Sequence, residues 1–254
     1  MTARPLVACE GVEKRFDDGT LALASLDLTL TQGEFLSIVG PSGCGKSTTL
    51  RLLSGLSSPS AGRIRWDQHH ETHPKGLDLG FVFQEPTLMP WAKVIDNVML
   101  PLKLKGLARN EAEGRAASVL SLVGLTGFER AYPRQLSGGM KMRVSLARAL
   151  VTEPRVLLLD EPFAALDEIN RLKLNDELLE LWQRQQLTVA FVTHSVYESV
   201  FLSNRVVVMS PRPGRVVADV RIDAPYPRAR EFRHGPVYAD CCRLVSAALA
   251  AAMI

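Results

Sequence analysis

The sequence predicts an α/β fold whose core is a mostly parallel sheet. Short apolar runs typical of buried strands, such as Phe35–Val39 and Val156–Leu159, alternate with stretches that have a helical period. Polar or glycine residues follow these runs directly, at Gly40, Asp160 and His194. Because the carboxyl ends of parallel strands meet at one edge of a sheet, we expect the functional residues to lie along that edge.

Length and composition indicate one large globular domain. The chain has 254 residues, of which 46% are hydrophobic and 22% charged. A formal net charge of +3, without a Lys/Arg block interleaved with aromatic residues, argues against an extended nucleic-acid surface. The longest apolar stretches are far shorter than the ~20 residues of a membrane-spanning helix, and the N-terminus does not read as a secretory signal. We therefore expect a cytosolic protein.

The cysteines and the one histidine-rich stretch do not predict a structural metal site. Cys9, Cys44, Cys241 and Cys242 form no C-x-x-C pair and no zinc-like spacing, which fits a reducing compartment. The stretch 69–73, which reads HHETH, is polar and has no second ligand cluster nearby. We expect it to be a solvated loop.

Strand and helix patterns can be placed along most of the chain. Two strands are expected at 6–10 and 26–30, with a turn at 17–19 between them. The other predicted elements are strands at 62–67, 78–83 and 188–193, helices after 40–47, between 139 and 150 and at 168–185, and a helical insert at 94–125 interrupted at Pro101, Gly106 and Gly114. After a proline-rich stretch, a short apolar helix at 237–254 could pack on the core or contact a partner, and packing is favoured.

A phosphate-binding loop is predicted at residues 40–47, which read GPSGCGKS and match G-x-x-x-x-G-K-[ST] between a strand and a helix. Its glycines let the backbone N–H groups point at phosphate oxygens, aided by the positive end of the following helix. Lys46 would reach the β- and γ-phosphates, and the Ser47 hydroxyl would ligate Mg²⁺. The residues expected to bind nucleotide here are Gly40, Pro41, Ser42, Gly43, Cys44, Gly45, Lys46, Ser47 and Thr48.

Two carboxylates follow the second buried strand. Asp160 would hold Mg²⁺, through a water molecule, and Glu161 would lie beside the γ-phosphate. A base that activates the attacking water typically contributes ~10²–10⁴-fold to the rate, so loss of Glu161 is expected to stop hydrolysis and spare binding. Together with the phosphate loop, this pair predicts an ATP hydrolase.

The residues Leu136–Met140, LSGGM, lie just upstream of the acidic strand, and at this point the sequence resembles the ABC (ATP-binding cassette) ATPase family with its LSGGQ signature. Met140 replaces the usual Gln, which puts any contact of that last side chain in doubt. The resemblance covers about residues 6–220. It continues through Gln84 of the Q-loop, Ala165-Leu166-Asp167 of the D-loop and the switch histidine His194.

The resemblance implies a phosphate-loop NTPase of the ABC type, with an N-terminal antiparallel β-subdomain beside the parallel core sheet. The ABC-type domain would span 6–236, with a small helical subdomain at about 91–139 and a tail helix at 237–254. In the implied mechanism two copies form a dimer, and ATP on one phosphate loop is capped by Ser137, Gly138 and Gly139 of the other copy. The further implied roles are catalysis by Glu161, His194 and Lys46, adenine stacking by Phe16, a nucleotide contact at Asp167 and metal binding by Ser47, Gln84 and Asp160.

Three further stretches, 84–91, 161–167 and 209–214, look like the nitrate/sulfonate/taurine importer branch, where Met commonly follows the Ser-Gly-Gly. This resemblance implies a motor subunit that energises import of a small anion or organic solute through a separate integral-membrane permease. A periplasmic or lipid-anchored solute-binding protein would take part indirectly. The expected location is the cytoplasmic face of the bacterial inner membrane, as a peripheral subunit, with substrate and direction left open.

Two other classes compete with this interpretation. A soluble ABC ATPase that acts on nucleic acid or ribosomes usually has two cassettes in one chain or a long coiled-coil insertion, and this sequence has neither. A small-molecule phosphotransferase with the same loop would have no reason to contain Ser137–Gly139 and His194.

Cys44 is the unusual residue of the phosphate loop. It lies near a helix N-terminus and close to Lys46, a setting that lowers the pKa of a thiol. One hypothesis is therefore that a thiol alkylator blocks ATPase activity and Mg-ATP protects. The alternative is a buried, inert thiol.

Overall fold

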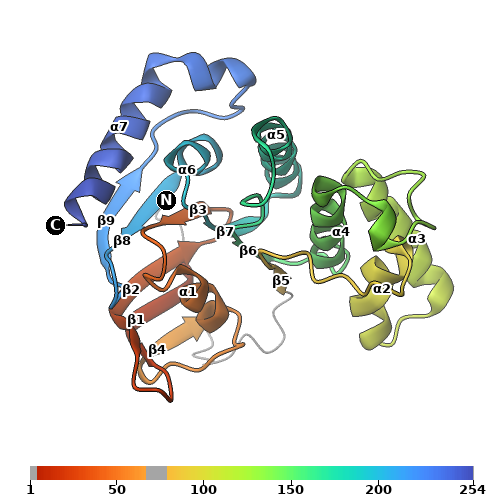
Figure 1. The fold of residues 1–254 in the computed structure, drawn as a ribbon, viewed down its shortest axis with the longest axis horizontal. Helices are drawn as coiled ribbons and strands as arrows, with labels where there is room; N and C mark the ends of the chain where they lie inside the picture. Colours follow the sequence, from red (N-terminus) through yellow and green to blue (C-terminus); the bar gives the residue numbers. More distant parts are fainter. Residues whose placement is uncertain (1–4, 67–78, 254) are drawn as a thin grey trace. The chain divides into compact units, whose positions relative to one another are not determined.

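A computed structural model describes residues 5–66 and 79–253 of the chain, which divides into two compact units (Figure 1). The first unit comprises 1–76 and 178–254, and the second comprises 77–177. The histidine-rich stretch 69–73, expected as a solvated loop, lies outside the described residues.

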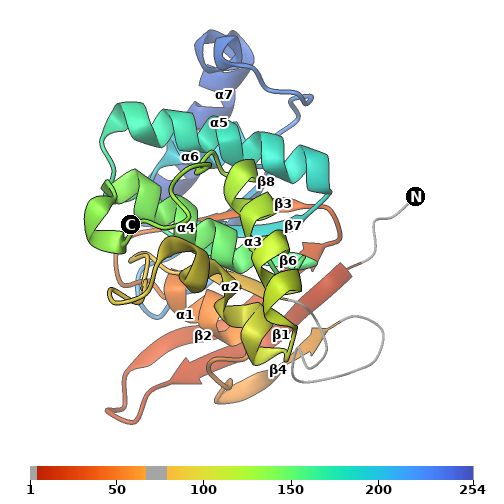
Figure 2. The same ribbon diagram turned by 90° about the vertical axis from the view of Figure 1, so that its right-hand side faces the viewer.

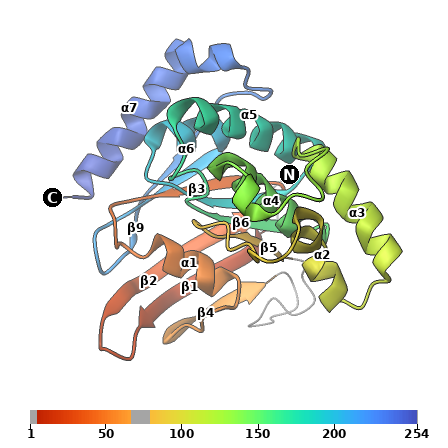
Figure 3. The ribbon, with the colours of Figure 1, turned by 45° about the vertical axis from the view of Figure 1, so that its right-hand side comes forward.

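An antiparallel sheet forms the N-terminal part of the first unit. It consists of β1 (Pro5–Arg15), β2 (Leu21–Thr31) and β4 (Ala61–Trp66) in the order β2-β1-β4. Cys9 pairs with Leu28 on one side and Ile64 on the other, and from Ala24 to Leu30 alternate residues of β2 are buried, as a sheet with one covered face requires. Figure 3 shows α1 (Lys46–Leu53) beside this sheet, and α1 contacts β2. This confirms the predicted antiparallel β-subdomain.

The first unit also contains a mainly parallel sheet with the order β7-β3-β8-β9. The strands β3 (Phe35–Val39), β7 (Thr188–Val192) and β8 (Arg205–Met209) are parallel, and β9 (Val216–Arg221) pairs antiparallel with β8. Every residue of β3 and β7 is buried. Continuous apolar burial is typical of parallel strands covered on both faces, so the pattern that predicted these strands has its expected cause.

The tail helix α7 (Pro236–Ala251) packs on the first unit, as predicted. It contacts α6 (Val196–Leu202), β8, β9 and the short 3-10 helix η3 (Arg230–His234), and Figure 1 shows it running along this part of the fold. Tyr238, Cys242 and Val245 form its buried face.

The second unit combines two parallel strands with helices. β5 (Leu79–Val82) pairs with β6 (Val156–Asp160). The helices α2 (Val94–Leu104), α3 (Arg109–Leu122) and α4 (Gly138–Leu150) contact one another and lie side by side in Figure 2. A 3-10 turn η2 (Pro133–Gln135) precedes α4, and α5 (Glu168–Gln185) begins in this unit.

The helical insert differs from the prediction in where it is interrupted. The chain leaves the helix at Gly106, where φ is 81°, whereas Pro101 and Gly114 lie inside α2 and α3. Pro101 has no N–H to donate to the Asn97 carbonyl, yet α2 continues to Leu104, and the Lys105 N–H donates to the Pro101 carbonyl at 3.1 Å. Gly114 lowers the stability of α3 by up to about 1 kcal/mol relative to alanine but does not break it.

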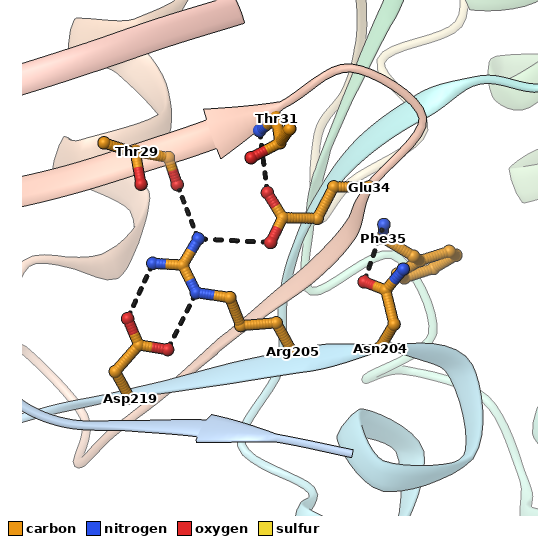
Figure 4. A network of polar contacts seen from close by, with 7 residues as sticks. All are labelled: Thr29, Thr31, Glu34, Phe35, Asn204, Arg205 and Asp219. Atoms are coloured by element: carbon orange, nitrogen blue, oxygen red, sulfur yellow. Dashed lines mark hydrogen bonds and ion pairs between the residues drawn. The ribbon is translucent and has the colours of Figure 1, made fainter. Parts of the chain in front are cut away.

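A polar network ties the two sheets of the first unit together (Figure 4). The Arg205 guanidinium pairs with both Asp219 carboxylate oxygens at 2.7 Å, with Glu34 at 3.1 Å and with the Thr29 carbonyl at 2.9 Å. Asn204 accepts the Phe35 N–H at 3.2 Å. A cavity of about 720 Å³ lies around this network, at the end of β3 opposite the phosphate loop. Since Arg205 already has two carboxylate partners, we assign the network a structural role.

Candidate nucleotide site

The phosphate loop connects β3 to α1 in the first unit. Gly43 and Gly45 have φ of 76° and 104°, the left-handed region that favours glycine. A Cβ built on Gly45 would come within 2.6 Å of the Leu23 side chain and 3.1 Å of the Ala22 carbonyl oxygen. Gly45 is also the N-cap of α1, so the loop brings a tight turn and the backbone N–H groups of a helix start to one place.

Lys46 is held inside this loop. Its ammonium donates to the carbonyl oxygens of Gly40 at 2.9 Å and Pro41 at 3.1 Å, and the residue is only 5% exposed. Ser42 and Gly43 are exposed, and Ser47 and Thr48 are half-buried. The loop therefore presents backbone and hydroxyl groups around a fixed positive charge, which suits a polyphosphate.

Cys44 lies beneath the loop. It is fully buried, and its N–H donates to the Pro41 carbonyl at 3.3 Å. A Cβ on Gly40 would come within 2.8 Å of its sulfur, and one on Gly214 would lie 1.9 Å from its carbonyl oxygen. The structure therefore contradicts the hypothesis of a thiol open to an alkylator, because close packing between these glycines leaves a reagent no access to the sulfur.

Phe16 lies at the turn between β1 and β2. Its N–H donates to the Thr20 carbonyl at 3.0 Å, which closes the turn. The ring is 40% exposed, and the Lys14 ammonium lies 5.6 Å from its centroid. The ring is thus not a core residue, and a flat exposed face of this kind suits stacking on a base.

His194 follows β7 and is exposed. The residues on either side of it are tied to α6. The Thr193 hydroxyl donates to the Glu198 carboxylate at 2.5 Å and accepts the Ser195 N–H at 3.0 Å, and the Ser195 hydroxyl caps α6 by accepting the Glu198 N–H at 3.3 Å. These bonds fix the backbone that carries the His194 imidazole.

In the second unit, β6 ends at Asp160, and Glu161 follows it directly. Asp160 is buried, with 6% exposure, and Glu161 is half-buried with a φ of 44°. A non-glycine residue pays about 1–2 kcal/mol for this left-handed conformation, which turns the chain sharply at the end of the strand. Strain of this kind is concentrated at functional sites.

The signature segment forms the start of α4. The Ser137 hydroxyl accepts the Met140 N–H at 3.3 Å and so caps the helix. A Cβ on Gly138 would meet nothing closer than 3.7 Å, and one on Gly139 nothing closer than 4.0 Å. Packing within the unit therefore does not require glycine at either position, and the open backbone is available for close approach from outside.

The loop after β5 carries Gln84, which is exposed. Two residues that the sequence did not single out hold this loop. The buried Asn97 accepts the Met89 N–H at 2.7 Å and donates to the carbonyls of Met89, Ala92 and Lys93. Arg148 donates to the carbonyls of Pro86 and Thr87 at 3.0 and 2.9 Å. A polar residue on the buried face of a predicted helix was the one available signal for Asn97.

Asp167 in the D-loop is exposed and caps the start of α5. Its carboxylate accepts the side-chain N–H of Asn170 at 2.6 Å and the backbone N–H of Asn170 at 3.1 Å. These hydrogen bonds lower the pKa of Asp167, and the bond from the Asn170 side chain has the larger effect. The next residues bring apolar side chains to the surface, with Ile169 81% exposed.

The predicted residues thus fall into two sets. The first unit holds the phosphate loop, Phe16 and His194, and the second holds Gln84, Ser137–Gly139, Asp160, Glu161 and Asp167. Within the described residues, no group of three or more His, Cys, Asp or Glu could hold a metal ion. The Ser47 hydroxyl in the first unit and the Asp160 carboxylate in the second are each the kind of oxygen donor that Mg²⁺ prefers.

The phosphate loop, the strand that ends in two acids and the glycine-containing helix start define a phosphate-loop nucleotide hydrolase. A family model described as ABC transporter matches residues 23–164. The chain belongs to this family, and it is an ATPase of the ATP-binding cassette type.

Relatives of known designation support the assignment. The chain is 46% identical over 205 residues to a nitrate import ATP-binding protein of Synechocystis sp., covering 81% of this chain and 77% of the relative. It is 45% identical over 226 residues to a taurine import ATP-binding protein of Rhizobium johnstonii (86% and 85%), and 43% identical over 221 residues to an aliphatic sulfonates import ATP-binding protein of Bacillus licheniformis (86% and 85%).

Solved structures agree with the fold. The chain matches the dimeric structure of a post-hydrolysis state of an ATP-binding cassette bound to ADP and Pi, with a TM-score of 0.76 and 32% identity. The match covers 86% of this chain and all of that one. Within the part of the chain that the structure describes, no helix has the length and apolar character that a membrane crossing requires.

Proposed function

We propose that this chain is the motor subunit of an importer for a small anion or organic solute and works with a separate permease at the cytoplasmic face of the bacterial inner membrane. Support comes from the relatives designated for nitrate, taurine and sulfonate import. Association with the membrane would be peripheral. A solute-binding protein, periplasmic or lipid-anchored, would deliver the solute to the permease.

The site residues have separate roles in this proposal. Lys46 and the loop N–H groups bind the β- and γ-phosphates, and Phe16 stacks on adenine. Glu161 accepts a proton from the attacking water, and His194 contacts the γ-phosphate. The residues proposed to hold Mg²⁺ are Ser47, Gln84 and Asp160. When bound, Mg²⁺ neutralises charge that develops on the phosphates.

Two copies act together in this proposal, and the observation that carries it is the open backbone at the signature segment. Gly138 is exposed, and neither it nor Gly139 is required to be glycine by neighbouring atoms. A backbone without side chains at a helix N-terminus can approach a phosphate closely. We therefore place Ser137, Gly138 and Gly139 against the nucleotide of a second copy, with the D-loop residue Asp167 near the same interface.

The surface that meets the permease is proposed to include the loop after Gln84. Trp91 is 77% exposed and Leu104 is 80% exposed, which is unusual for side chains of this size. The bonds from Asn97 and Arg148 hold the loop that carries Trp91. A fixed loop beside Gln84 suits transmission of nucleotide state to a partner.

The proposed domain division keeps one ABC-type domain at 6–236, with a helical subdomain at about 91–139 and a tail helix at 237–254. The helical subdomain would contain the permease-facing surface. The tail would belong structurally to the cassette.

The test of hydrolysis and dimerisation compares wild type with Glu161→Gln and with Glu180→Gln, an exposed control on α5. We expect Glu161→Gln to lose Mg-dependent ATPase activity and to elute as a dimer only with ATP, while Glu180→Gln behaves as wild type. A Glu161→Gln variant that hydrolyses at the wild-type rate and stays monomeric with ATP would contradict the proposal.

The transport role has its own test. Membranes that contain the permease should retain the chain, and Trp91→Ala should weaken retention without lowering the affinity for ATP. Stimulation of ATPase activity by DNA or RNA that fades with salt would instead favour the nucleic-acid alternative.

A further inference from the structure

The C-terminal end of α6 is held by an arginine from the segment that follows β9. Helices leave their last carbonyl groups without intrahelical partners, and in a helix of seven residues this affects more than half of its length. Here the Arg228 guanidinium supplies donors. One of its terminal nitrogens, Nη1, donates to the carbonyl oxygens of Val200, Phe201 and Ser203 at 2.8, 3.0 and 2.8 Å.

The same side chain ties α6 to its own segment. The other terminal nitrogen, Nη2, donates to the carbonyls of Ile222 at 3.4 Å and Ala224 at 3.1 Å. Two tyrosines also bond to α6. The Tyr226 hydroxyl donates to the Leu202 carbonyl at 2.9 Å, and the Tyr238 hydroxyl donates to the Tyr197 carbonyl at 3.1 Å. Side chains from residues 226–238 thus bind α6 at both of its ends and in its last turn.

Arg228 is built into the interior. It is only 5% exposed, and its guanidinium carbon lies 4.1 Å from the ring centroid of Tyr226 and 5.2 Å from that of Phe232. Burial lowers the pKa of the guanidinium. Five carbonyl dipoles and the negative end of α6 stabilise the positive charge in this setting. A lysine has three donors and no planar fork, so it could keep only some of these bonds.

The other end of α6 fixes the switch histidine. Ser195 caps the helix, and Glu198 in the first turn of the helix accepts a hydrogen bond from the Thr193 hydroxyl. His194 therefore lies between two residues, Thr193 and Ser195, that are both bonded to α6. A helix of two turns moves as one body. A displacement of its carboxyl end would therefore be transmitted to the backbone that carries the imidazole.

We propose that Arg228 is a positioning residue for His194 and acts by clamping α6 through the carbonyl groups of its last turn. The proposal rests on the function proposed above for His194 as the γ-phosphate contact. It gives the proline-rich C-terminal segment a part in ATP hydrolysis although that segment contains none of the cassette motifs. Small misplacements of a catalytic group can cost ~10²-fold in rate, so a positioning residue can matter as much as a contact residue.

The kinetic test uses Arg228→Gln, Arg228→Lys, His194→Ala and the double variant His194→Ala/Arg228→Gln. For Arg228→Gln we expect kcat to fall roughly 10-fold with KM for ATP little changed, because the phosphate loop still binds the nucleotide. Arg228→Lys should recover part of the loss and supplies the measurement if the glutamine variant does not fold. In the His194→Ala background the Arg228 change should have no further effect on kcat.

The matched control is Val245→Ala. Val245 is fully buried on α7, so this change removes packing from the same region and leaves every hydrogen bond to α6 in place. We expect it to lower the melting temperature and leave kcat near the wild-type value. A Val245→Ala variant that is equally destabilised and equally slow would overturn the proposal, because loss of stability alone would then explain the effect.

A second measurement does not depend on activity. The imidazole NMR signal of His194 is assigned as the one that disappears in His194→Ala. It should shift in Arg228→Gln and remain unchanged in Val245→Ala, below the melting temperature of each variant. An unshifted signal, or full additivity in the double variant, overturns the role of Arg228. If His194→Ala retains full activity, the proposed function of His194 fails instead, and the NMR shift still decides whether Arg228 positions the ring.

Discussion

At the scale of single residues, two glycines of the predicted nucleotide site differ in whether the fold requires them. Gly45 has a left-handed φ and no room for a Cβ, so its own unit requires it. Gly138 satisfies neither condition and still lies at an exposed helix start. Because Gly138 lies at a helix N-terminus, where backbone N–H groups can meet an anion, we attribute its lack of a side chain to a contact with another molecule.

The first prediction concerns Gly138→Ala. Because a Cβ there would meet only ordinary contacts within the unit, we expect the free energy of unfolding to stay unchanged or rise by up to about 1 kcal/mol. ATP-dependent dimerisation and hydrolysis should fall at least tenfold, because the added methyl blocks the approach of phosphate. Chemical unfolding, ATPase assays and size exclusion measure the three quantities.

Gly114→Ala is the control, since it lies inside α3 with nothing within 4 Å of its Cβ position. It should stabilise the protein and leave ATPase activity and dimerisation unaffected. If Gly138→Ala behaves in the same way, the cross-copy contact at the signature segment is contradicted.

The second prediction concerns the thiols. Cys241 is half-buried, whereas Cys9, Cys44 and Cys242 are buried. Burial raises the pKa of Cys9 to about 12 and of Cys242 to about 11, and it also raises the pKa of Cys241, so access to the sulfur is what distinguishes Cys241. We expect a thiol reagent to modify one cysteine per native chain, namely Cys241. Peptide mass mapping checks this result, and Cys241→Ser should abolish the fast reaction. Rapid labelling of Cys44 that Mg-ATP suppresses would restore the hypothesis that its thiol is reactive.

At the scale of elements, strand ends are fixed by side chains from neighbouring strands. Arg205 at the start of β8 joins β9 through Asp219 and the start of β3 through Glu34. Its side chain is 16% exposed and that of Glu34 is 11% exposed, so solvent screens their ion pair only weakly.

The third prediction is that Arg205→Gln lowers the free energy of unfolding by about 2–3 kcal/mol, because Glu34 loses its cation in a largely buried setting. Urea unfolding measures the change. Arg63→Gln removes a more exposed partner of Glu10 and should cost less than about 1 kcal/mol. Equal effects of the two changes would show that burial of the Arg205 network does not strengthen it.

The fourth prediction concerns alkaline pH and the segment that binds α6. Burial raises the pKa of Tyr226 to about 12, above its ordinary value near 10. The neutral hydroxyl is the favoured form in the fold, so its contribution to stability is complete below pH 10 and is lost as the pH rises towards 12. Tyr226→Phe should therefore show a shallower loss of stability between pH 10 and 12, measured by unfolding at each pH.

Sequence patterns predicted most of the elements and missed three consecutive ones near the C-terminal end of the cassette. The helix at 168–185 and the strand at 35–39 have the predicted bounds, because apolar periodicity and flanking polar residues agree there. β8, β9 and α6 were not predicted, although β8 contains three consecutive valines. The seven residues of α6 are too few for a clear period, and tertiary hydrogen bonds such as those of Arg228 hold it.

In the candidate nucleotide site, too, some residues could be predicted from the sequence and others could not. The phosphate loop and the acid pair follow from spacing, because backbone N–H groups and carboxylates must lie at fixed positions after their strands. Arg148 and Arg228 act through carbonyl groups 62 and 28 residues away, which no local sequence pattern predicts. Asn97 bonds to carbonyl groups four to eight residues away, and these contacts depend on how the chain before α2 turns back on the helix. The burial of Cys44 depends on close approach of Gly214, which only the fold reveals.

At the scale of the whole molecule, the residues proposed for catalysis and nucleotide binding belong to two units of the chain. Lys46 and His194 belong to the first unit, and Asp160, Glu161 and Ser137 to the second. If one nucleotide needs residues from both units and from a second copy, its binding should stabilise the whole assembly rather than one part.

The last prediction uses this coupling. In Glu161→Gln, which should bind ATP without hydrolysing it, saturating Mg-ATP at about 100-fold above its Kd should add roughly 2.7 kcal/mol by mass action, and the dimer should add a further term that grows with protein concentration. The melting temperature should therefore rise with ATP and, only when ATP is present, with protein concentration. Adding Lys46→Ala to the variant should abolish both effects, since phosphate binding is lost. A melting temperature that responds to ATP but not to protein concentration would mean that each copy binds nucleotide alone, which would contradict the two-copy site.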